Sequence, residues 1–427
     1  MTIGDRPKPT GLVRLWRAFG NTWKGYLGAF REEAAFRQEL ALCVLLFPVG
    51  LWLGQDGLER ALLVTPLFII LIVERHRARA PRAVGARQGH RLGGGVHLVR
   101  AAGDGLGAGT LGEVRMTALI CGSVAYDTVM VFEGQFKDHI LSDRIHMLNV
   151  AFLVPALRRN FGGCAGNIAY NLKLLGGDGK VMATVGHDFG PYRAWMRDNG
   201  LPDDLISELA DHYTAQAYIT TDADNNQITA FHPGAMERAH LNEVPRGAGI
   251  RLGIVAPESH RGMLEHASQF AAAGIPFVFD PGQAMTLLGG DDLRVLIGQA
   301  SWVAVNDYEA SLLVERTGWG LADIADKVQA LIVTRGGEGS HIHAGGTVIE
   351  IPPVKPERVA DPTGCGDAYR GGLLYGLQRG LDWTVTGRIA SLMGALKVAH
   401  HGTQNHRFGR EEFARLYKQA FGAALEA

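Results

Sequence analysis

Short apolar runs alternate with segments of helical periodicity along residues 116–427. Runs rich in β-branched and aliphatic residues lie at 253–256, 276–280, 302–305 and 330–334, and a similar run follows Met116 and ends at Gly122. Strands that alternate with helices in this way form a mostly parallel sheet with helices on both faces. We therefore predict an α/β fold, whose ligands would bind at the carboxyl ends of the strands.

The first 74 residues follow a different pattern. Apolar runs at 40–53 and 61–73 flank a polar turn at 54–57, and each is shorter than the roughly 20 residues that a membrane-spanning helix needs. The pattern fits either a buried helical hairpin or a marginal membrane hairpin. Aromatic residues recur upstream at helical spacing, as in a helix on a membrane surface or one packed on a soluble core: Trp16, Phe19, Trp23, Tyr26, Phe30 and Phe36.

Composition divides the chain into predicted parts at 1–74, 75–115 and 116–427. Residues 75–115 contain no Phe, Trp, Tyr, Ile or Lys, which predicts a disordered Gly/Ala/Arg-rich linker. Lys and Arg outnumber Asp and Glu by 16 to 9 in residues 1–115, and Asp and Glu outnumber them by 34 to 26 afterwards. No CxxC pair occurs, which argues against disulfides and structural zinc and fits a reducing cytosol; the cysteines are Cys43, Cys121, Cys164 and Cys365.

The segment 361–367 places a glycine-flanked turn between two carboxylates and leads into an apolar helical pattern at 368–377. Backbone N–H groups at a helix N-terminus, left bare by Gly364 and Gly366, would cradle the negative charge of a phosphoryl group. Asp367 would take the proton from an attacking hydroxyl group. The alternative is a helix-capping loop rich in Asp and Gly.

The segment 161–172 opens a helix with small residues that would let the backbone approach a ligand. Asn167 offers both a donor and an acceptor, and together with Asp127 it would grip vicinal hydroxyl groups. Close packing of helix against strand, with Gly162 and Gly163 serving only that purpose, is the alternative.

Two further segments follow predicted strands. Asn306 and Glu309 share one helical face and would order water around a magnesium-bound phosphate, or Asn306 would simply cap a solvated helix. The turn with Thr334, Gly336 and Gly339 would carry nucleotide contacts or simply close a hairpin.

Taken together and in this order, these segments resemble the ribokinase-like (PfkB) family of sugar and nucleoside kinases. Residues 162–175 resemble its first signature, and residues 361–367 resemble its second, D-x-T-G-x-G-D. The resemblance covers nearly all of residues 116–427. It implies a ribokinase-like sandwich with a parallel-rich central sheet and a small β lid, which would include residues 217–221 and 227–231. It also implies transfer of the γ-phosphate of ATP to a primary alcohol, with Mg²⁺.

The resemblance implies a role for each site residue. Asp367 would be the base, and Gly364, Cys365 and Gly366 would supply the anion hole; Cys365 stands where the family commonly has Ala. The other roles would be sugar binding by Asp127, Gly162, Gly163 and Asn167, indirect magnesium and phosphate binding by Asn306 and Glu309, and nucleotide binding by Thr334, Gly336 and Gly339.

Residues 149–154 and 402–406 are more similar to the bacterial adenosine kinase branch than to ribokinase. We therefore predict adenosine as the acceptor, phosphorylated on its 5′-hydroxyl, with ribose or another furanose sugar as the alternative. Phe152, Phe161 and Phe231 would stack on a purine or belong to the core. The expected partners are the nucleoside or sugar and ATP, with no nucleic acid.

Residues 10–74 resemble bacterial diacylglycerol kinase, a membrane enzyme with three transmembrane helices. The resemblance implies that Glu33 and Glu74 match two active-site carboxylates, but the family's Lys-Asp pair and third helix do not follow. When residues 86–98 are reverse-translated and their degenerate codons are read one nucleotide later, they permit the sequence RAKDIGSAAVFI. This sequence resembles the missing Lys-Asp pair and third helix of the family. We hypothesise that residues 75–115 are an out-of-frame translation that runs into a second gene product starting at Met116.

Several classes of function follow. The favoured class is a cytoplasmic ATP-dependent kinase that carries a fragment of a membrane enzyme. A kinase tethered to the inner membrane by residues 1–74 is a second class, and a non-catalytic nucleoside-binding protein is a third. Lipid kinase activity is disfavoured by the missing Lys-Asp pair. The oligomeric state and any need for a monovalent cation are left open.

Overall fold

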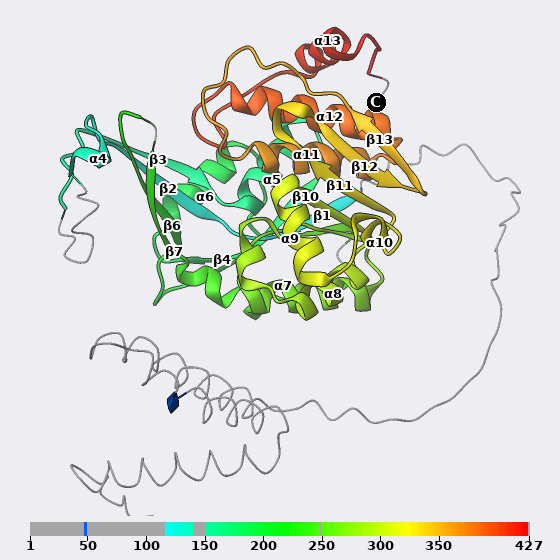
Figure 1. Cartoon of the computed structure of the whole chain (residues 1–427), viewed down its shortest axis with the longest axis horizontal. Helices are drawn as coiled ribbons and strands as arrows, with labels where there is room; N and C mark the ends of the chain where they lie inside the picture. Colours follow the sequence, from blue (N-terminus) through cyan, green and yellow to red (C-terminus); the bar gives the residue numbers. More distant parts are fainter. Residues whose placement is uncertain (1–46, 49–115, 140–149, 225, 248, 426–427) are drawn as a thin grey trace, which may run out of the picture. The chain divides into compact units, whose positions relative to one another are not determined.

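The computed structural model describes residues 47–48, 116–139, 150–224, 226–247 and 249–425 (Figure 1). The chain divides into two units, Met1–Gly107 and Ala108–Ala427, and the described residues lie almost wholly in the second. Apart from residues 47–48, the predictions for residues 1–115 lie outside the described residues. Within the described ranges, every helix is too short or too polar to cross a lipid bilayer.

A nine-stranded sheet forms the centre of the second unit, in the order β13-β12-β11-β10-β9-β8-β1-β4-β5. Its strands are β1 (Thr117–Cys121), β4 (Gly179–Gly186), β5 (Leu205–Leu209), β8 (Ile250–Val255), β9 (Phe277–Phe279), β10 (Trp302–Asn306), β11 (Ala330–Thr334), β12 (Ser340–Ala344) and β13 (Thr347–Ile351). Pairing is parallel from β11 to β5, and β12 and β13 add an antiparallel edge. Each predicted apolar run coincides with or overlaps one of these strands, so the predicted fold class is confirmed.

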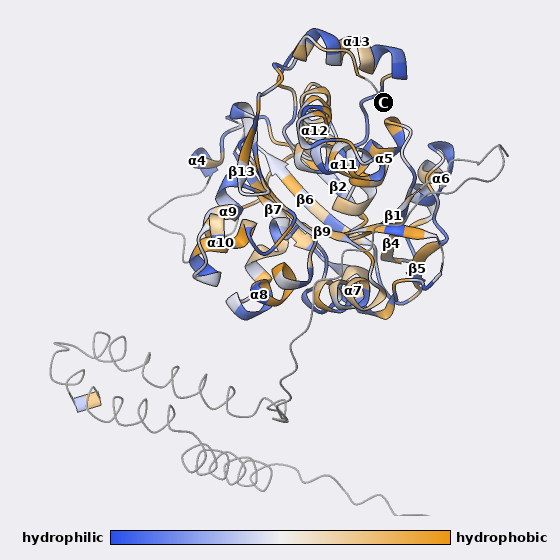
Figure 2. Ribbon diagram, turned by 90° about the vertical axis from the view of Figure 1, so that its right-hand side faces the viewer, coloured by the Kyte–Doolittle hydropathy of each residue, from blue (hydrophilic) through white to orange (hydrophobic). Residues whose placement is uncertain are grey.

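Helices cover both faces of this sheet (Figures 1 and 2). One face carries α5 (Cys164–Leu174), α6 (Gly190–Asp198), α11 (Cys365–Gln378), α12 (Trp383–Val398) and α13 (Arg410–Phe421). The other carries α7 (His260–Ala273), α8 (Gly290–Gln299), α9 (Asp307–Thr317) and α10 (Leu321–Ala325). Shorter helical segments are α4 (Phe136–His139), η2 (Gly234–Leu241), η3 (Gly282–Leu287) and η4 (Gly336–Glu338).

Burial on both faces explains the continuous apolar runs of the central strands. Ala118 and Ile120 on β1 pack into the core beneath α5 and α11, whereas Leu119 and Cys121 pack into the core beneath α7 and α8. Successive strand residues point to opposite faces, so a strand that is covered on both sides must be apolar at every position.

A smaller four-stranded sheet, in the order β3-β2-β6-β7, projects from one end of this unit and is called the lid sheet here (Figure 1). Its strands are β2 (Ala125–Val131), β3 (Ala156–Gly162), β6 (Ala215–Thr221) and β7 (Gln227–His232). The two lid segments predicted from the sequence, 217–221 and 227–231, are confirmed as parts of β6 and β7. Every residue of β7 is exposed.

Candidate active site

The 361–367 turn leads into α11, which begins at Cys365 and has Gly364 as its N-cap. Gly364 has a φ of 77°, and a Cβ atom there would lie 2.8 Å from Cγ2 of Thr403, so the position requires glycine. A Cβ atom at Gly366 would meet nothing within 4 Å. The N–H groups of a first helical turn have no partner within the helix, which leaves those of Gly366 and Asp367 for a ligand, whereas the N–H of Cys365 donates to the carbonyl of Pro362 at 3.2 Å.

Asp367 lies in this first helical turn and accepts a hydrogen bond of 2.7 Å from Nδ2 of Asn167 on α5. Gln404 holds Asn167 in place, because its Nε2 donates to Oδ1 of Asn167 at 3.0 Å and to the hydroxyl of Tyr192 at 2.6 Å. Nε1 of Trp195 donates to Oε1 of Gln404 at 2.9 Å. The network orients the Asn167 amide with its donor toward Asp367. Sequence reasoning missed the role of Gln404, although the segment 402–406 had been noticed.

Burial raises the pKa of Asp367 to about 7. The charge of Asp280 adds to the shift, whereas the hydrogen bonds from Asn167 and Cys164 and the charge of Arg370 oppose it. A carboxyl group with a pKa near neutrality both accepts and releases a proton readily, which is what a general base must do.

Asp127, on strand β2 of the lid sheet, is the second carboxyl group with a raised pKa. Burial, and then the charge of Asp361, raises the pKa of Asp127 to about 6. A Cβ atom at Gly162 would lie 2.3 Å from Oδ2 of Asp127. Gly163 has a φ of 85°, and a Cβ atom there would lie 2.6 Å from the backbone nitrogen of Ala125. Close packing is therefore present at Gly163, where β3 leads into α5, whereas Gly162 makes room for the Asp127 carboxyl group of the neighbouring strand.

One row of the lid sheet places four residues opposite one another, and they are Asn160, Asp127, Ala217 and Phe231. Directly opposed residues share one face of a sheet, so Phe231, which is 52% exposed, lies on the same face as Asp127. Oδ1 of Asn160 lies 3.2 Å from the position of a Cβ atom at Gly402. Sequence reasoning missed Asn160, because cross-strand neighbours are known only once the register is known.

The other two aromatic residues proposed to stack on a purine have aromatic partners within the protein. Phe161 stacks on Trp195 with ring centroids 5.2 Å apart. Phe152 packs against Phe132 and Phe136 with centroid distances of 4.9 and 5.0 Å. These contacts fit the alternative interpretation, in which both are packing residues.

Asn306 and Glu309 form a reciprocal cap at the start of α9. Oδ1 of Asn306 accepts from the N–H of Glu309 at 2.7 Å, and Oε2 of Glu309 accepts from the N–H of Asn306 at 2.9 Å. The capping role weighed for Asn306 is therefore present. Thr334 stands opposite Asn306 in the parallel pairing of β10 and β11, so these predicted site residues lie together at the carboxyl ends of their strands.

A buried ion pair between Asp280 and Arg370 joins this edge of the sheet to α11. Nε and an Nη atom of Arg370 donate to the two carboxylate oxygens of Asp280 at 3.2 and 3.1 Å, and the guanidinium also donates to the carbonyl of Ala304 at 3.0 Å. Both side chains are buried. Sequence reasoning missed the pair; its signal was an acidic residue at the end of an apolar strand, the position where α/β ligands bind.

Gly336 and Gly339 lie in the connection between the antiparallel strands β11 and β12, so the hairpin weighed as the alternative is present. Gly339 has a φ of 89°, and a Cβ atom there would lie 2.1 Å from the carbonyl oxygen of Ile351. Backbone geometry therefore accounts for this glycine, and its predicted contact with a nucleotide stays a prediction.

The described residues contain no group of three or more His, Cys, Asp or Glu side chains that could hold a metal ion by itself. Mg²⁺ in phosphoryl-transfer sites is usually bound by one or two carboxylates, water and the phosphates of the substrate. Burial, and then the charge of Asp280, raises the pKa of Glu309, and a cation would relieve this concentration of negative charge. The residues therefore fit magnesium that arrives with a nucleotide.

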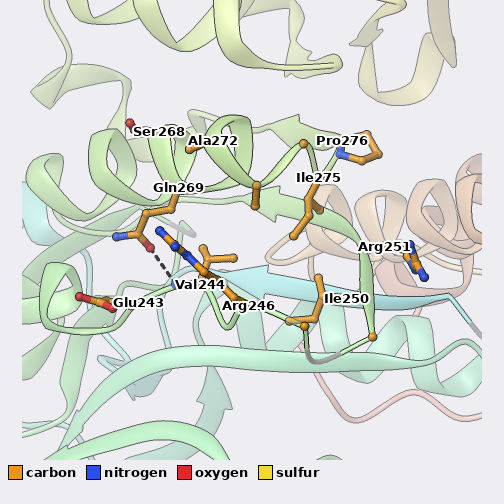
Figure 3. Close-up of a pocket in the computed structure, with 14 residues that line it drawn as sticks. Glu243, Val244, Arg246, Ile250, Arg251, Ser268, Gln269, Ala272, Ile275 and Pro276 are labelled. Atoms are coloured by element: carbon orange, nitrogen blue, oxygen red, sulfur yellow. Dashed lines mark hydrogen bonds between the residues drawn. The ribbon is translucent and has the colours of Figure 1, made fainter.

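A pocket of about 860 Å³ lies elsewhere, between the residues that precede and begin β8 and the C-terminal end of α7 (Figure 3). Its lining includes Val244, Ile250 and Gln269, and Oε1 of Gln269 accepts from the N–H of Val244 at 2.7 Å. Ile250 starts β8, so the pocket lies at the amino ends of the parallel strands. The residues discussed above gather at the opposite, carboxyl ends.

Comparison with known proteins finds two separate matches along the chain. Residues 20–78 match prokaryotic diacylglycerol kinase. Over 65 residues the chain is 40% identical to the diacylglycerol kinase of Escherichia coli, which corresponds to 15% of this chain and 53% of that protein. The chain thus spans about half the length of that relative.

The larger part matches one carbohydrate kinase family and several nucleoside kinases. The solved structure of Burkholderia thailandensis nucleoside kinase in complex with inosine has a TM-score of 0.66 and 52% identity, and the match covers 72% of this chain and 99% of that one. The nucleoside kinase of Methanocaldococcus jannaschii is 31% identical over 262 residues, 60% of this chain and 85% of that protein. Residues 126–407 match the pfkB family carbohydrate kinase model. The chain therefore belongs to the pfkB carbohydrate kinase family, and is a phosphotransferase that uses an alcohol group as acceptor.

Proposed function

We propose that residues 116–427 transfer the γ-phosphate of ATP to the 5′-hydroxyl group of a purine nucleoside, with adenosine as the predicted acceptor. The observation that carries the proposal is Asp367, a carboxyl group with a raised pKa that Asn167 orients at the N-terminus of α11. Inosine is the second candidate, because the kinase from Burkholderia thailandensis, 52% identical, was solved in complex with it.

The proposed reaction uses the carboxylate of Asp367 and the main-chain N–H groups at the start of α11. As the acceptor oxygen bonds to the γ-phosphorus, its proton passes to the carboxylate of Asp367, and the bond from phosphorus to the departing ADP oxygen breaks. N–H groups at the start of α11, beside Gly364 and Gly366, stabilise the charge on the transferring oxygens. Asn306 and Glu309 would hold Mg²⁺ through water, and the ion would supply positive charge next to the phosphates.

The lid sheet supplies the groups that would bind a nucleoside. The carboxylate of Asp127 would accept hydrogen bonds from vicinal ribose hydroxyl groups, beside the side-chain amide of Asn160. The exposed ring of Phe231 shares their face and would stack on the base. Support for a nucleoside over a simple sugar comes from this aromatic position, which a furanose alone would leave unused.

The base assignment is tested by Asp367→Asn. We expect kcat to fall by roughly 10² to 10⁴-fold, because the amide cannot accept the proton, while the dissociation constant of the nucleoside in calorimetry stays close to that of the unaltered chain. Asp204→Asn is the matched control, because Asp204 is exposed and forms a surface ion pair with Lys180. Near-normal turnover by Asp367→Asn would refute the assigned base.

The acceptor is tested by measuring ATP consumption with adenosine, inosine, guanosine, ribose and fructose. We expect the highest kcat/KM for a purine nucleoside. A higher value for ribose or fructose would make the chain a sugar kinase instead. Nucleoside binding without ATP consumption would indicate a non-catalytic binding protein.

A further inference from the structure

The side chain of Lys397, in the last turn of α12, is fully buried. Its ammonium group donates to the main-chain carbonyl of Asp361 at 2.7 Å and to that of His400 at 3.2 Å, and it lies 4.0 Å from Oδ2 of Asp361. Lysine is almost never fully buried unless it is paired, because the ammonium loses its hydration. Here the oxygen atoms that replace water belong largely to the first residue of the 361–367 turn.

Asp361 is held at each of its polar groups. Its N–H donates to the carbonyl of Val398 at 3.1 Å, and its own carbonyl accepts from Lys397. One carboxylate oxygen accepts from the N–H of Thr363 and the other from the N–H of Gly402, both at 2.9 Å. The beginning of the turn is thereby fastened to the C-terminal end of α12 and the residues that follow it.

Electrostatic contacts extend from the ammonium along the turn. Burial lowers the pKa of Lys397, and the negative charge of Asp361, followed by the groups of Cys365 and Asp367, acts in the opposite direction. The turn collects two carboxylates and, in the reaction, a phosphoryl group. A fixed positive charge inside the protein would offset this repulsion.

We propose that Lys397 is a built-in cation that holds the 361–367 turn in the shape needed for phosphoryl transfer. It is a positioning residue, because its buried ammonium contacts Asp361 of the turn and the carbonyl of His400. The inference rests on the proposed role of Asp367 in that turn. It also predicts that turnover needs no added monovalent cation, because an ammonium group already occupies the oxygen-lined position.

The experiment uses the full chain with Lys397→Met, Lys397→Gln and Lys397→Ala. Met keeps the length of the side chain without the charge, Gln keeps a neutral N–H donor, and Ala leaves a space that a small cation can enter. Lys180→Met is the matched control, because Lys180 pairs at the surface with Asp204. The readouts are kcat, KM for nucleoside and for ATP, and the thermal unfolding temperature.

We expect Lys397→Met and Lys397→Gln to lower kcat by about 10²-fold, the cost of a small misplacement of catalytic groups, with little change in the nucleoside KM. Methylammonium or ammonium chloride should restore part of the kcat of Lys397→Ala, whereas tetramethylammonium chloride, at the same ionic strength, should not. The unaltered chain and Lys180→Met should turn over equally in all three salts.

Three results would overturn the inference. The first is a normal kcat in Lys397→Met or Lys397→Gln, and the second is a folded Lys397→Ala whose kcat no added cation raises. The third is loss of folding in all three variants. The last result would make Lys397 a residue of the fold alone. The assignment of Asp367 as the base is tested separately. Near-normal turnover of Asp367→Asn would refute that assignment. If Asp367→Asn is inactive but Lys397→Met turns over normally, only the inference about Lys397 is refuted.

Discussion

At the scale of single residues, the chemistry depends on how the environment changes ordinary carboxyl groups. Asp367 and Asp127 have the same side chain as the many exposed aspartates of this chain, yet burial raises their pKa values to about 7 and about 6. Asp361 differs, because although burial acts to raise its pKa, the N–H groups of Gly402 and Thr363 and the charge of Lys397 hold that pKa below its usual value. Three aspartates of one site thus have three acidities.

The raised pKa of Asp367 predicts the pH dependence of the reaction. The proposed base would work only when deprotonated, so kcat/KM should fall as pH decreases below about 7, approaching tenfold per pH unit. An aspartate at its ordinary pKa of about 3.9 would leave the rate level over the same range. This pH dependence is checked by measuring kcat/KM from pH 5 to 9 and repeating the measurement with Asp127→Asn, which removes the second titrating group. A kcat/KM that stays level over this range would contradict the prediction.

At the scale of elements, the N-terminus of α11 contains two glycines with different structural roles. Gly364 is required by its positive φ and by Thr403, whereas Gly366 faces open space. The helix cap and the phosphate cradle, weighed as alternatives in the sequence, are compatible at one turn, because a helix that begins with glycine leaves its first N–H groups uncovered.

Alanine at these two positions should separate folding from catalysis. Gly364→Ala should lower the free energy of unfolding by about 1 to 3 kcal/mol, the usual cost of backbone strain. Gly366→Ala should leave stability unchanged or slightly higher, since Ala favours a helix, and yet lower kcat because the methyl group enters the proposed phosphoryl position. Thermal unfolding and kcat measure the two effects. Gly298→Ala on α8, where a Cβ atom also meets nothing within 4 Å, is the control. Unchanged kcat in Gly366→Ala would argue against the cradle.

The lid sheet offers a second comparison within one strand. Phe231 lies on the face of Asp127, whereas Ile228, 44% exposed, lies on the opposite face of β7. We expect Phe231→Ala to raise the nucleoside KM by about 5- to 150-fold, as lost base stacking of 1 to 3 kcal/mol would do, with kcat nearly unchanged. Ile228→Ala should change neither. Steady-state kinetics with adenosine and inosine checks both variants. Equal effects of the two substitutions on the nucleoside KM would mean that the purine base binds elsewhere.

At the scale of the whole molecule, the central sheet, the lid sheet and every site residue discussed above belong to residues 116–427. The family model matches 126–407, and the Burkholderia thailandensis kinase is covered over 99% of its length. A segment that matches prokaryotic diacylglycerol kinase precedes this part of the chain, over residues 20–78.

We predict that residues 116–427, produced alone, keep a kcat/KM close to that of the full chain, because a domain with its own core folds on its own. Parallel assays of the two proteins check this. A large loss of activity in the shorter protein would give residues 1–115 a functional role and contradict the out-of-frame hypothesis, which resequencing of codons 74–116 tests directly.

Local sequence was enough to predict five strands of the central sheet, the α/β class and the turn before α11. Those features depend on apolar periodicity and on glycine conformation, which are properties of neighbouring residues. Local sequence also nominated Asp367 and Asn167, but it could not join them, because they are 200 positions apart. The Asp280–Arg370 pair, Gln404, Asn160 and the ammonium of Lys397 were decided by tertiary structure alone. Their partners come from distant strands and helices, and polar groups that lose water on folding need such partners.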